Sequence, residues 1–128
     1  MNMVVLDTNI LVSAFLSPGG NSAKIMTLLV DGQLRLCYSN EILNEYKDVI
    51  LRPKFSFEPA YVHVVLDRLT SKGVCVTPSP LGVPFSDEDD RKFYETAKFC
   101  CAPLVTGNLR HFPQEPDVMS PAEFLNQF

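Results

Sequence analysis

The chain opens with an apolar run, Met3 to Leu6, that stops abruptly on Asp7. So short and uninterrupted a run is typical of a strand buried on both faces, as in a parallel sheet. A helical pattern begins at Ile10, so we expect a tight strand-to-helix turn with Thr8 or Asn9 as the N-cap. Because α/β sheets bind ligands beyond the carboxyl ends of their strands, Asp7 is a candidate functional residue. The alternative is that Asp7 only caps the helix.

Strand and helix patterns alternate along the rest of the chain. The predicted strands are residues 3–6, 34–38, 74–77, 104–106 and 117–119, and the predicted helices are residues 10–16, 22–31, 40–52, 59–72, 87–101 and a short one after Ser120. This order predicts a three-layer α/β/α sandwich with a central, mainly parallel sheet of about four to five strands. At 128 residues, one domain covering 1–128 is expected.

A soluble, cytoplasmic protein is expected from a composition that is 46% hydrophobic and 20% charged. No apolar run is long enough to span a membrane, and the N-terminus lacks the basic region and cleavage site of a signal peptide, so no membrane partner is expected. The four cysteines form no paired CxxC motifs, and both histidines lie far from them in sequence. We therefore expect reduced core thiols and no zinc site.

Negative charge is concentrated in Asp87–Asp90, within a chain whose formal net charge is −4. This balance normally disfavours a nucleic-acid partner, because such affinity comes mainly from neutralising phosphates. One or two divalent cations bound to the segment would cancel most of the excess. A nucleic-acid partner therefore remains compatible with the composition if the site binds metal.

Several polar residues follow predicted strands. Asp7 and Ser39 come directly after the first two, the acidic segment follows the third after a loop, and Asn108 follows the fourth. Because the connections of a parallel sheet all leave from one edge, we expect these groups to gather there. Glu45 lies on the helix after Ser39, at the edge of its apolar arc. For Glu45, a surface ion pair and a metal ligand agree equally well with the pattern.

Asp90 is the acid with the clearest structural requirement. At about 100° per residue, it lies within about 20° of the centre of the apolar stripe that contains Phe93, and Asp87 lies near the same stripe. A carboxylate on a buried face needs backbone donors, a cation or a metal, and we favour a metal. The alternative is that these acids only stabilise the helix N-terminus, with Ser86 and Asp89 as a capping pair.

These motifs resemble those of the PIN domain nucleases, a family that includes VapC-like toxins. The likeness spans essentially the whole chain, through Asp7-Thr8-Asn9, Ser39–Glu45, the helix opening with Asp87–Asp90, and Val105–Asn108. By this resemblance, Asp7, Glu45 and Asp90 correspond to three of the family's acidic residues. Asn108 stands where the family usually has a fourth acid.

The resemblance implies a metal-dependent endoribonuclease that cleaves single-stranded RNA, the toxin of a toxin–antitoxin system. A cognate antitoxin is the implied partner, and a homodimer is a further implied state. The implied site comprises catalytic Asp7, Glu45, Asp90 and Asn108, metal-binding Asp7, Asp87 and Asp90, and positioning Thr8, Asn9, Ser39 and Thr106.

The residue types suit Mg²⁺ or Mn²⁺, which prefer carboxylate oxygens and water. Such an ion would lower the pKa of a bound water and orient that water toward a phosphodiester. The candidate substrate-binding residues are Arg91, Arg110 and His111, together with Lys47 and Arg52, and each is equally consistent with a solvated surface charge.

Asn108 leaves a second interpretation open. An amide oxygen can ligate Mg²⁺ but brings no negative charge, so the chain can instead be a catalytically weak or inactive PIN-like module that binds RNA or protein. A receiver-like phospho-acceptor domain is a third interpretation and ranks last. It requires an Asp after the third strand and a Lys near the fifth, and neither Thr77 nor Asp117–Met119 supplies them.

Overall fold

Strands and helices alternate along residues 2–128, the part of the chain that this computed structural model describes. In chain order the elements are β1 (Met3–Leu6), α1 (Thr8–Leu16), α2 (Asn21–Val30), β2 (Arg35–Tyr38), α3 (Asn40–Ile50), the 3₁₀ turn η1 (Pro53–Phe55), α4 (Pro59–Lys72), β3 (Val74–Cys75), α5 (Glu88–Cys100), β4 (Leu104–Val105), the 3₁₀ turn η2 (Leu109–His111), β5 (Val118–Met119) and α6 (Pro121–Gln127). The predicted α/β class and strand count are confirmed.

The five strands form one parallel sheet in the order β3-β2-β1-β4-β5. Strand β1 is central, pairing Val4 with Leu36 on one side and Val5 with Leu104 on the other. Its apolar residues are fully buried from Val4 to Leu6, as the opening run predicts. The chain crosses from one side of β1 to the other between β3 and β4, so the carboxyl end of β1 is the switch point where such sheets bind ligands.

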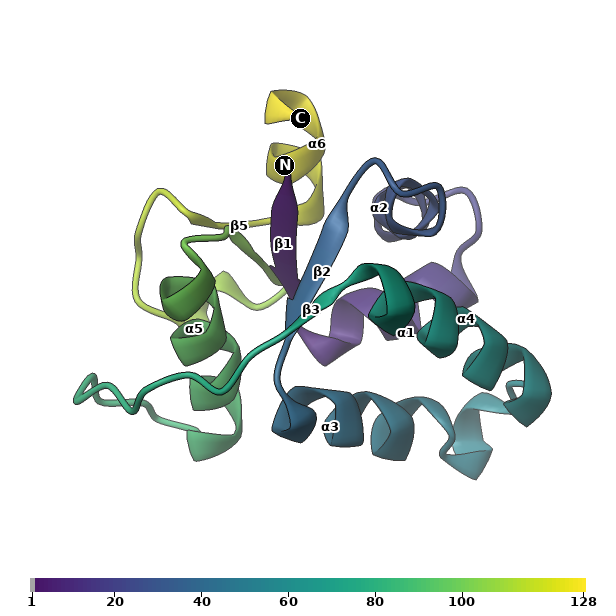
Figure 1. The fold of residues 1–128 in the computed structure, drawn as a ribbon, viewed down its shortest axis with the longest axis horizontal. Helices are drawn as coiled ribbons and strands as arrows, with labels where there is room; N and C mark the ends of the chain where they lie inside the picture. The colour runs from purple at the N-terminus through teal and green to yellow at the C-terminus, as the bar shows by residue number, and fades with distance from the viewer. Residues whose placement is uncertain (1) are drawn as a thin grey trace.

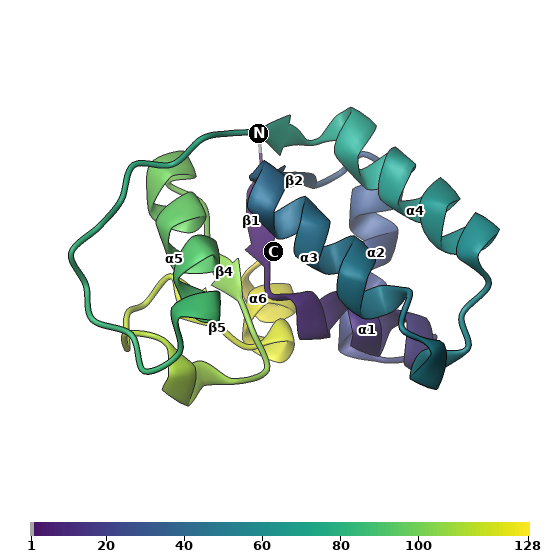
Figure 2. The same cartoon turned by 90° about the horizontal axis from the view of Figure 1, so that it is seen from below.

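Helices pack on both sides of the sheet (Figure 1). Helix α5 contacts β1, β2 and β4, and α1, α2 and α4 form a group on the opposite side. Seen from below in Figure 2, α3, the start of α1 and α5 surround the carboxyl end of the sheet. Asp7, the residue that follows β1, lies at this end.

Helix ends explain most differences from the predicted boundaries. The N-cap of α1 is Asp7 rather than Thr8 or Asn9, and the N-cap of α5 is Asp87, whose side chain accepts from the amide of Asp89 at 3.0 Å. Ser39 is the N-cap of α3, and its hydroxyl accepts a 3.2 Å hydrogen bond from the backbone N–H of Ile42.

Helix α4 ends at Lys72, as the predicted range 59–72 has it, and Gly73 is its C-cap. The φ of Gly73 is −88°, and a Cβ at this position would lie 2.6 Å from the Leu36 carbonyl oxygen. Glycine is therefore required by the close approach of β2.

The expectation of four core thiols is wrong for Cys75 and Cys101, which are exposed, although all four cysteines are free. Within residues 2–128, no helix is both long and apolar enough to cross a membrane.

Candidate functional site

A cleft of about 500 Å³ opens at the switch point of the sheet. Nine of the candidate site residues line it: Asp7, Thr8, Asn9, Glu45, Arg52, Asp87, Asp90, Asn108 and His111. They come from the ends of β1 and β4, from the starts of α1 and α5, from α3, from η2 and from the residue before η1. The parallel topology thus brings together residues from distant parts of the chain, as predicted.

Asp7 is held by the end of the neighbouring strand β4. Its Oδ2 accepts a 2.8 Å hydrogen bond from the Thr106 hydroxyl. Thr106 Oγ1 in turn accepts a 3.0 Å hydrogen bond from the backbone N–H of Asn108. Asp7 is the N-cap residue of α1, but its side chain makes no capping hydrogen bond. Burial raises the pKa of Asp7, the Thr106 hydrogen bond opposes this shift, the charge of Glu45 adds to it, and the nearby backbone N–H groups of Thr8 and Asn9 lower the pKa.

Helix α3 is anchored at the same strand end by Tyr46. This fully buried side chain donates a 2.6 Å hydrogen bond to the carbonyl oxygen of Leu6, one residue before Asp7. The bond fixes the distance between α3 and β1, and therefore places Glu45 beside Asp7. The helical pattern of residues 40–52 puts Tyr46 on the apolar face of its helix but does not show that its hydroxyl meets a strand carbonyl.

Glu45 forms an ion pair with a lysine that sequence reasoning missed. Its Oε1 lies 2.7 Å from Lys92 Nζ, and its Oε2 accepts a hydrogen bond from the Thr8 hydroxyl. Only 9% of the Lys92 side chain is exposed, and its ammonium also donates to the carbonyl oxygen of Asp89. Both oxygens of Glu45 therefore have partners within the protein, and the ion-pair interpretation of this residue agrees with the geometry.

Asp90 differs from Glu45, because one of its carboxylate oxygens, though buried, accepts no hydrogen bond within residues 2–128. Only 15% of its side chain is exposed, and its Oδ2 is buried without a hydrogen-bond partner in the described residues. The nearest basic group is His111, whose Nδ1 lies 3.5 Å from Oδ2. Burial raises the pKa of Asp90, the charges of Asp7 and Asp87 raise it further, and His111 and Lys92 oppose them. The inward orientation predicted for Asp90 is confirmed.

The donors in the cleft fit a hard divalent cation. The charge of Asp7 raises the pKa of Asp90, and a cation bound near these carboxylates would oppose that shift. The buried Oδ2 of Asp90 is an oxygen ligand that accepts no hydrogen bond within residues 2–128. As placed, the described His, Cys, Asp and Glu side chains form no ready-made group of three ligands. The Asn108 amide, which lines the cleft, adds an oxygen donor without charge.

Five predicted site residues do not line this cleft: Ser39, Lys47, Arg91, Thr106 and Arg110. Lys47 is exposed on α3, and Thr106 is buried and acts on the cleft through its hydrogen bond to Asp7. Arg91 turns toward the loop before α5, with Nε 2.9 Å from Glu88 and Nη1 donating to the Leu81 carbonyl at 2.7 Å. Arg110 is exposed on η2 and does not line the cleft. Ser39 acts as the cap of α3 and lines a different pocket.

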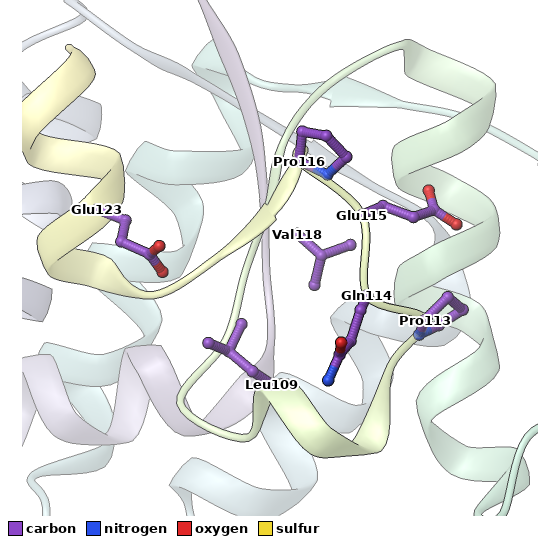
Figure 3. Close-up of a pocket in the computed structure, with 7 residues that line it drawn as sticks. All are labelled: Leu109, Pro113, Gln114, Glu115, Pro116, Val118 and Glu123. Carbon is purple, nitrogen blue, oxygen red and sulfur yellow. The ribbon is translucent and has the colours of Figure 1, made fainter.

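A second pocket, of about 350 Å³, lies between η2, β5 and the start of α6 (Figure 3). Its two carboxylates already have partners: Glu115 accepts from Tyr94 and pairs with Lys98, and Glu123 accepts from the Ser120 amide at 2.9 Å. In Figure 3 these two side chains are far apart and do not converge. The chemistry-bearing groups are therefore those of the cleft.

Comparisons with known proteins give a family and a fold. The family model described as PIN domain matches residues 3–110. The uncharacterized protein MJ1680 of Methanocaldococcus jannaschii is 32% identical over 108 residues, covering 82% of this chain and 70% of that protein. The structure of VapBC2 from Rickettsia felis, bound to a DNA fragment from their promoter, contains a chain of similar fold, with a TM-score of 0.59, 19% identity, and coverage of 92% of this chain and 96% of that chain.

Proposed function

The chain belongs to the PIN domain family, whose members are generally nucleases, and from this premise we propose that it is a divalent-metal-dependent endoribonuclease that cleaves single-stranded RNA. The observation that carries the proposal is the buried Oδ2 of Asp90, which within residues 2–128 accepts no hydrogen bond and has only His111 Nδ1 beside it at 3.5 Å, in the same cleft as the buried Asp7. A buried carboxylate oxygen without a hydrogen bond is costly, and a bound cation relieves that cost.

Mg²⁺ or Mn²⁺ bound by Asp7 and Asp90, with Asp87 or the Asn108 amide, would supply a water of lowered pKa and a charge near the phosphate. Thr106 orients Asp7, and Thr8 orients Glu45. Asn9 lines the cleft beside them, and Ser39 acts at a distance by capping α3. His111 lies where it can donate to a phosphate oxygen.

We also propose that a cognate antitoxin protein binds this chain and restrains a cytoplasmic nuclease, and that the chain forms a homodimer. The likeness to a chain of VapBC2 supports this proposal through fold alone. Co-purification of the product of a neighbouring gene, followed by size-exclusion chromatography with light scattering, tests both assemblies.

Incubation of the purified protein with labelled single-stranded RNA in Mn²⁺, in Mg²⁺ or in EDTA tests the nuclease. We expect cleavage only with metal, and its loss in Asp90→Asn. Asp31→Asn removes the same charge from an exposed position after α2 and serves as the matched control, which should cleave like the wild type. Equal products in EDTA, or full cleavage by Asp90→Asn, would refute the mechanism.

A module that binds RNA without cutting is the second candidate, and the amide of Asn108 in the cleft favours it. Metal-independent RNA binding without cleavage would support this candidate. In that case Asn108→Asp, which restores a fourth acid, should introduce metal-dependent cleavage.

A further inference from the structure

The positive charge of the cleft is confined to one end. Arg52 and Lys54 are the arginine and lysine that line it, whereas its carboxylates are Asp7, Glu45, Asp48, Asp87, Asp89 and Asp90. A phosphate is repelled by the acidic end and attracted to the basic one. Arg52 pairs with Asp48 through an exposed 3.0 Å contact between Nη2 and Oδ2, whereas Lys54 has no carboxylate within ion-pair distance in residues 2–128. An anionic backbone that enters the cleft therefore has its favourable contacts at the Arg52–Phe55 turn, which comprises the residue before η1 and η1 itself.

An aromatic side chain lies beside these two cations. Phe55 lines the cleft, and its ring stacks on that of Phe57 with centroids 5.5 Å apart and an interplanar angle of 7°. Phe57 in turn packs on Phe15 of α1, at 5.2 Å. Because α1 begins at Thr8, which also lines the cleft, this aromatic series fixes Phe55 relative to the acidic groups.

A proline and two backbone hydrogen bonds hold the conformation of the turn. Pro53 occupies the first position of η1, and the Phe55 amide donates to the Arg52 carbonyl at 3.1 Å. Ser56 closes the turn with φ of +54°, its amide donating to the Pro53 carbonyl at 3.1 Å. Lys54 is exposed, and its Nζ lies 5.1 Å from the centroid of the Phe55 ring. Its flexible stem lets the ammonium yield this position to a base and contact a phosphate instead.

We infer that the Arg52–Phe55 turn is a binding subsite for one unpaired nucleotide of a single-stranded RNA, with the base stacked on Phe55 and its phosphate held by Arg52 and Lys54. Basic side chains beside an aromatic ring are the combination that binds single strands without reading sequence. The inference rests on the proposed nuclease function and names the part of the cleft that holds the substrate beside the cleaved bond.

The test compares variants of the turn with remote variants of the same chemistry. Phe55→Ala is matched by Phe99→Ala, at an exposed aromatic near the far end of α5, and Lys54→Ala is matched by Lys24→Ala on α2. Affinity for a fluorescein-labelled 12-nucleotide single strand is measured by anisotropy in EDTA over a range of salt concentrations, and metal-dependent cleavage is measured in parallel. Phe55→Leu keeps the apolar contact with Phe57 and controls for misfolding.

We expect Phe55→Ala and Phe55→Leu to weaken single-strand affinity at least about 5-fold and to raise KM with little change in kcat. Lys54→Ala should reduce the salt slope of binding by about 0.7, the value for one phosphate contact with a single strand. Phe99→Ala and Lys24→Ala should change neither quantity, and a blunt-ended duplex without unpaired bases should bind the Phe55 variants as it binds the wild type.

Two results separate this inference from the proposed function. Wild-type cleavage with unchanged affinity and KM in the Phe55 variants would overturn the subsite and leave the nuclease intact, and this face would then be free for a protein partner. RNA binding that the Phe55 variants weaken, without any metal-dependent cleavage, would support the subsite and refute the nuclease.

Discussion

Replacement of Lys92 by Met tests whether the Glu45–Lys92 pair organises the cleft. The variant keeps the aliphatic stem but removes the ammonium, which leaves Glu45 charged beside Asp7. Losing one partner of a fully buried pair costs about 3–5 kcal/mol. Because Glu45 keeps 27% of its side chain exposed and Lys92 9%, we expect the free energy of unfolding to fall by about 2–3 kcal/mol.

The assay is urea unfolding in EDTA, followed by circular dichroism, for the wild type, Lys92→Met, Glu45→Gln and the double variant. The double variant removes both charges and should recover much of the loss, with a coupling free energy of at least about 1 kcal/mol. Mn²⁺ should stabilise Lys92→Met more than the wild type, because the cleft has gained a net negative charge and binds the cation more tightly.

A loss below about 0.5 kcal/mol with additive single variants would place the pair among ordinary surface ion pairs and would refute this reasoning. Lys98→Met is not a suitable comparison, because Lys98 joins Glu115 and Asp117 near β5. Lys24→Met at an exposed position of α2 is the appropriate control, and it should change stability by less than about 0.5 kcal/mol.

Three further predictions concern the acids and the residues that hold them. The folded-state pKa values of Asp7 and Asp90 are raised, so in EDTA their protonated forms favour folding at low pH, and this contribution is lost as pH rises from 3.8 through the raised values. Asp90→Asn should therefore gain stability relative to the wild type as pH increases, as measured by urea unfolding between about pH 4 and 7, and a constant difference would contradict this. Thr106→Val should lower stability by about 1 kcal/mol and weaken Mn²⁺ binding, as measured by calorimetry, because Asp7 loses its hydroxyl donor; unchanged Mn²⁺ affinity would show that Thr106 does not position a ligand. Asn108→Asp should tighten Mn²⁺ binding in the same assay, and equal affinity would remove position 108 from the ligands.

Local rules explain the parts of the molecule that could be predicted from sequence. The buried strand before Asp7, the Ser39 cap and the capping box at Ser120 each depend on residues within one turn or strand. The inward orientation of Asp90 follows from helical angle alone, because α5 is regular through its first turn. The gathering of the site residues follows from the parallel sheet, which brings separate strand ends to one edge.

Interactions between distant elements could not be predicted in this way. Lys92 and Arg91 are neighbours in sequence, but about 100° of helical rotation sends one toward Glu45 and the other toward the loop at Leu81. Sequence proximity to the acidic segment therefore assigned a substrate-binding role to Arg91, which lies outside the cleft. Selecting Lys92 required knowing which face of α5 meets α3, information that belongs to the tertiary structure.

The charge balance of the cleft links Lys92 to the amide at position 108. Glu45 is neutralised within the protein by Lys92, and Asn108 adds no charge, so the carboxylates buried without a cationic lysine or arginine are Asp7 and Asp90. Two such carboxylates carry the charge that one divalent ion balances. An Asp at position 108 would call for further positive charge, whereas the amide keeps an oxygen donor and leaves this balance unchanged. The departure from the usual acid is therefore compatible with a cleft that binds metal, because its net charge, rather than its number of acids, determines how strongly a divalent ion is attracted.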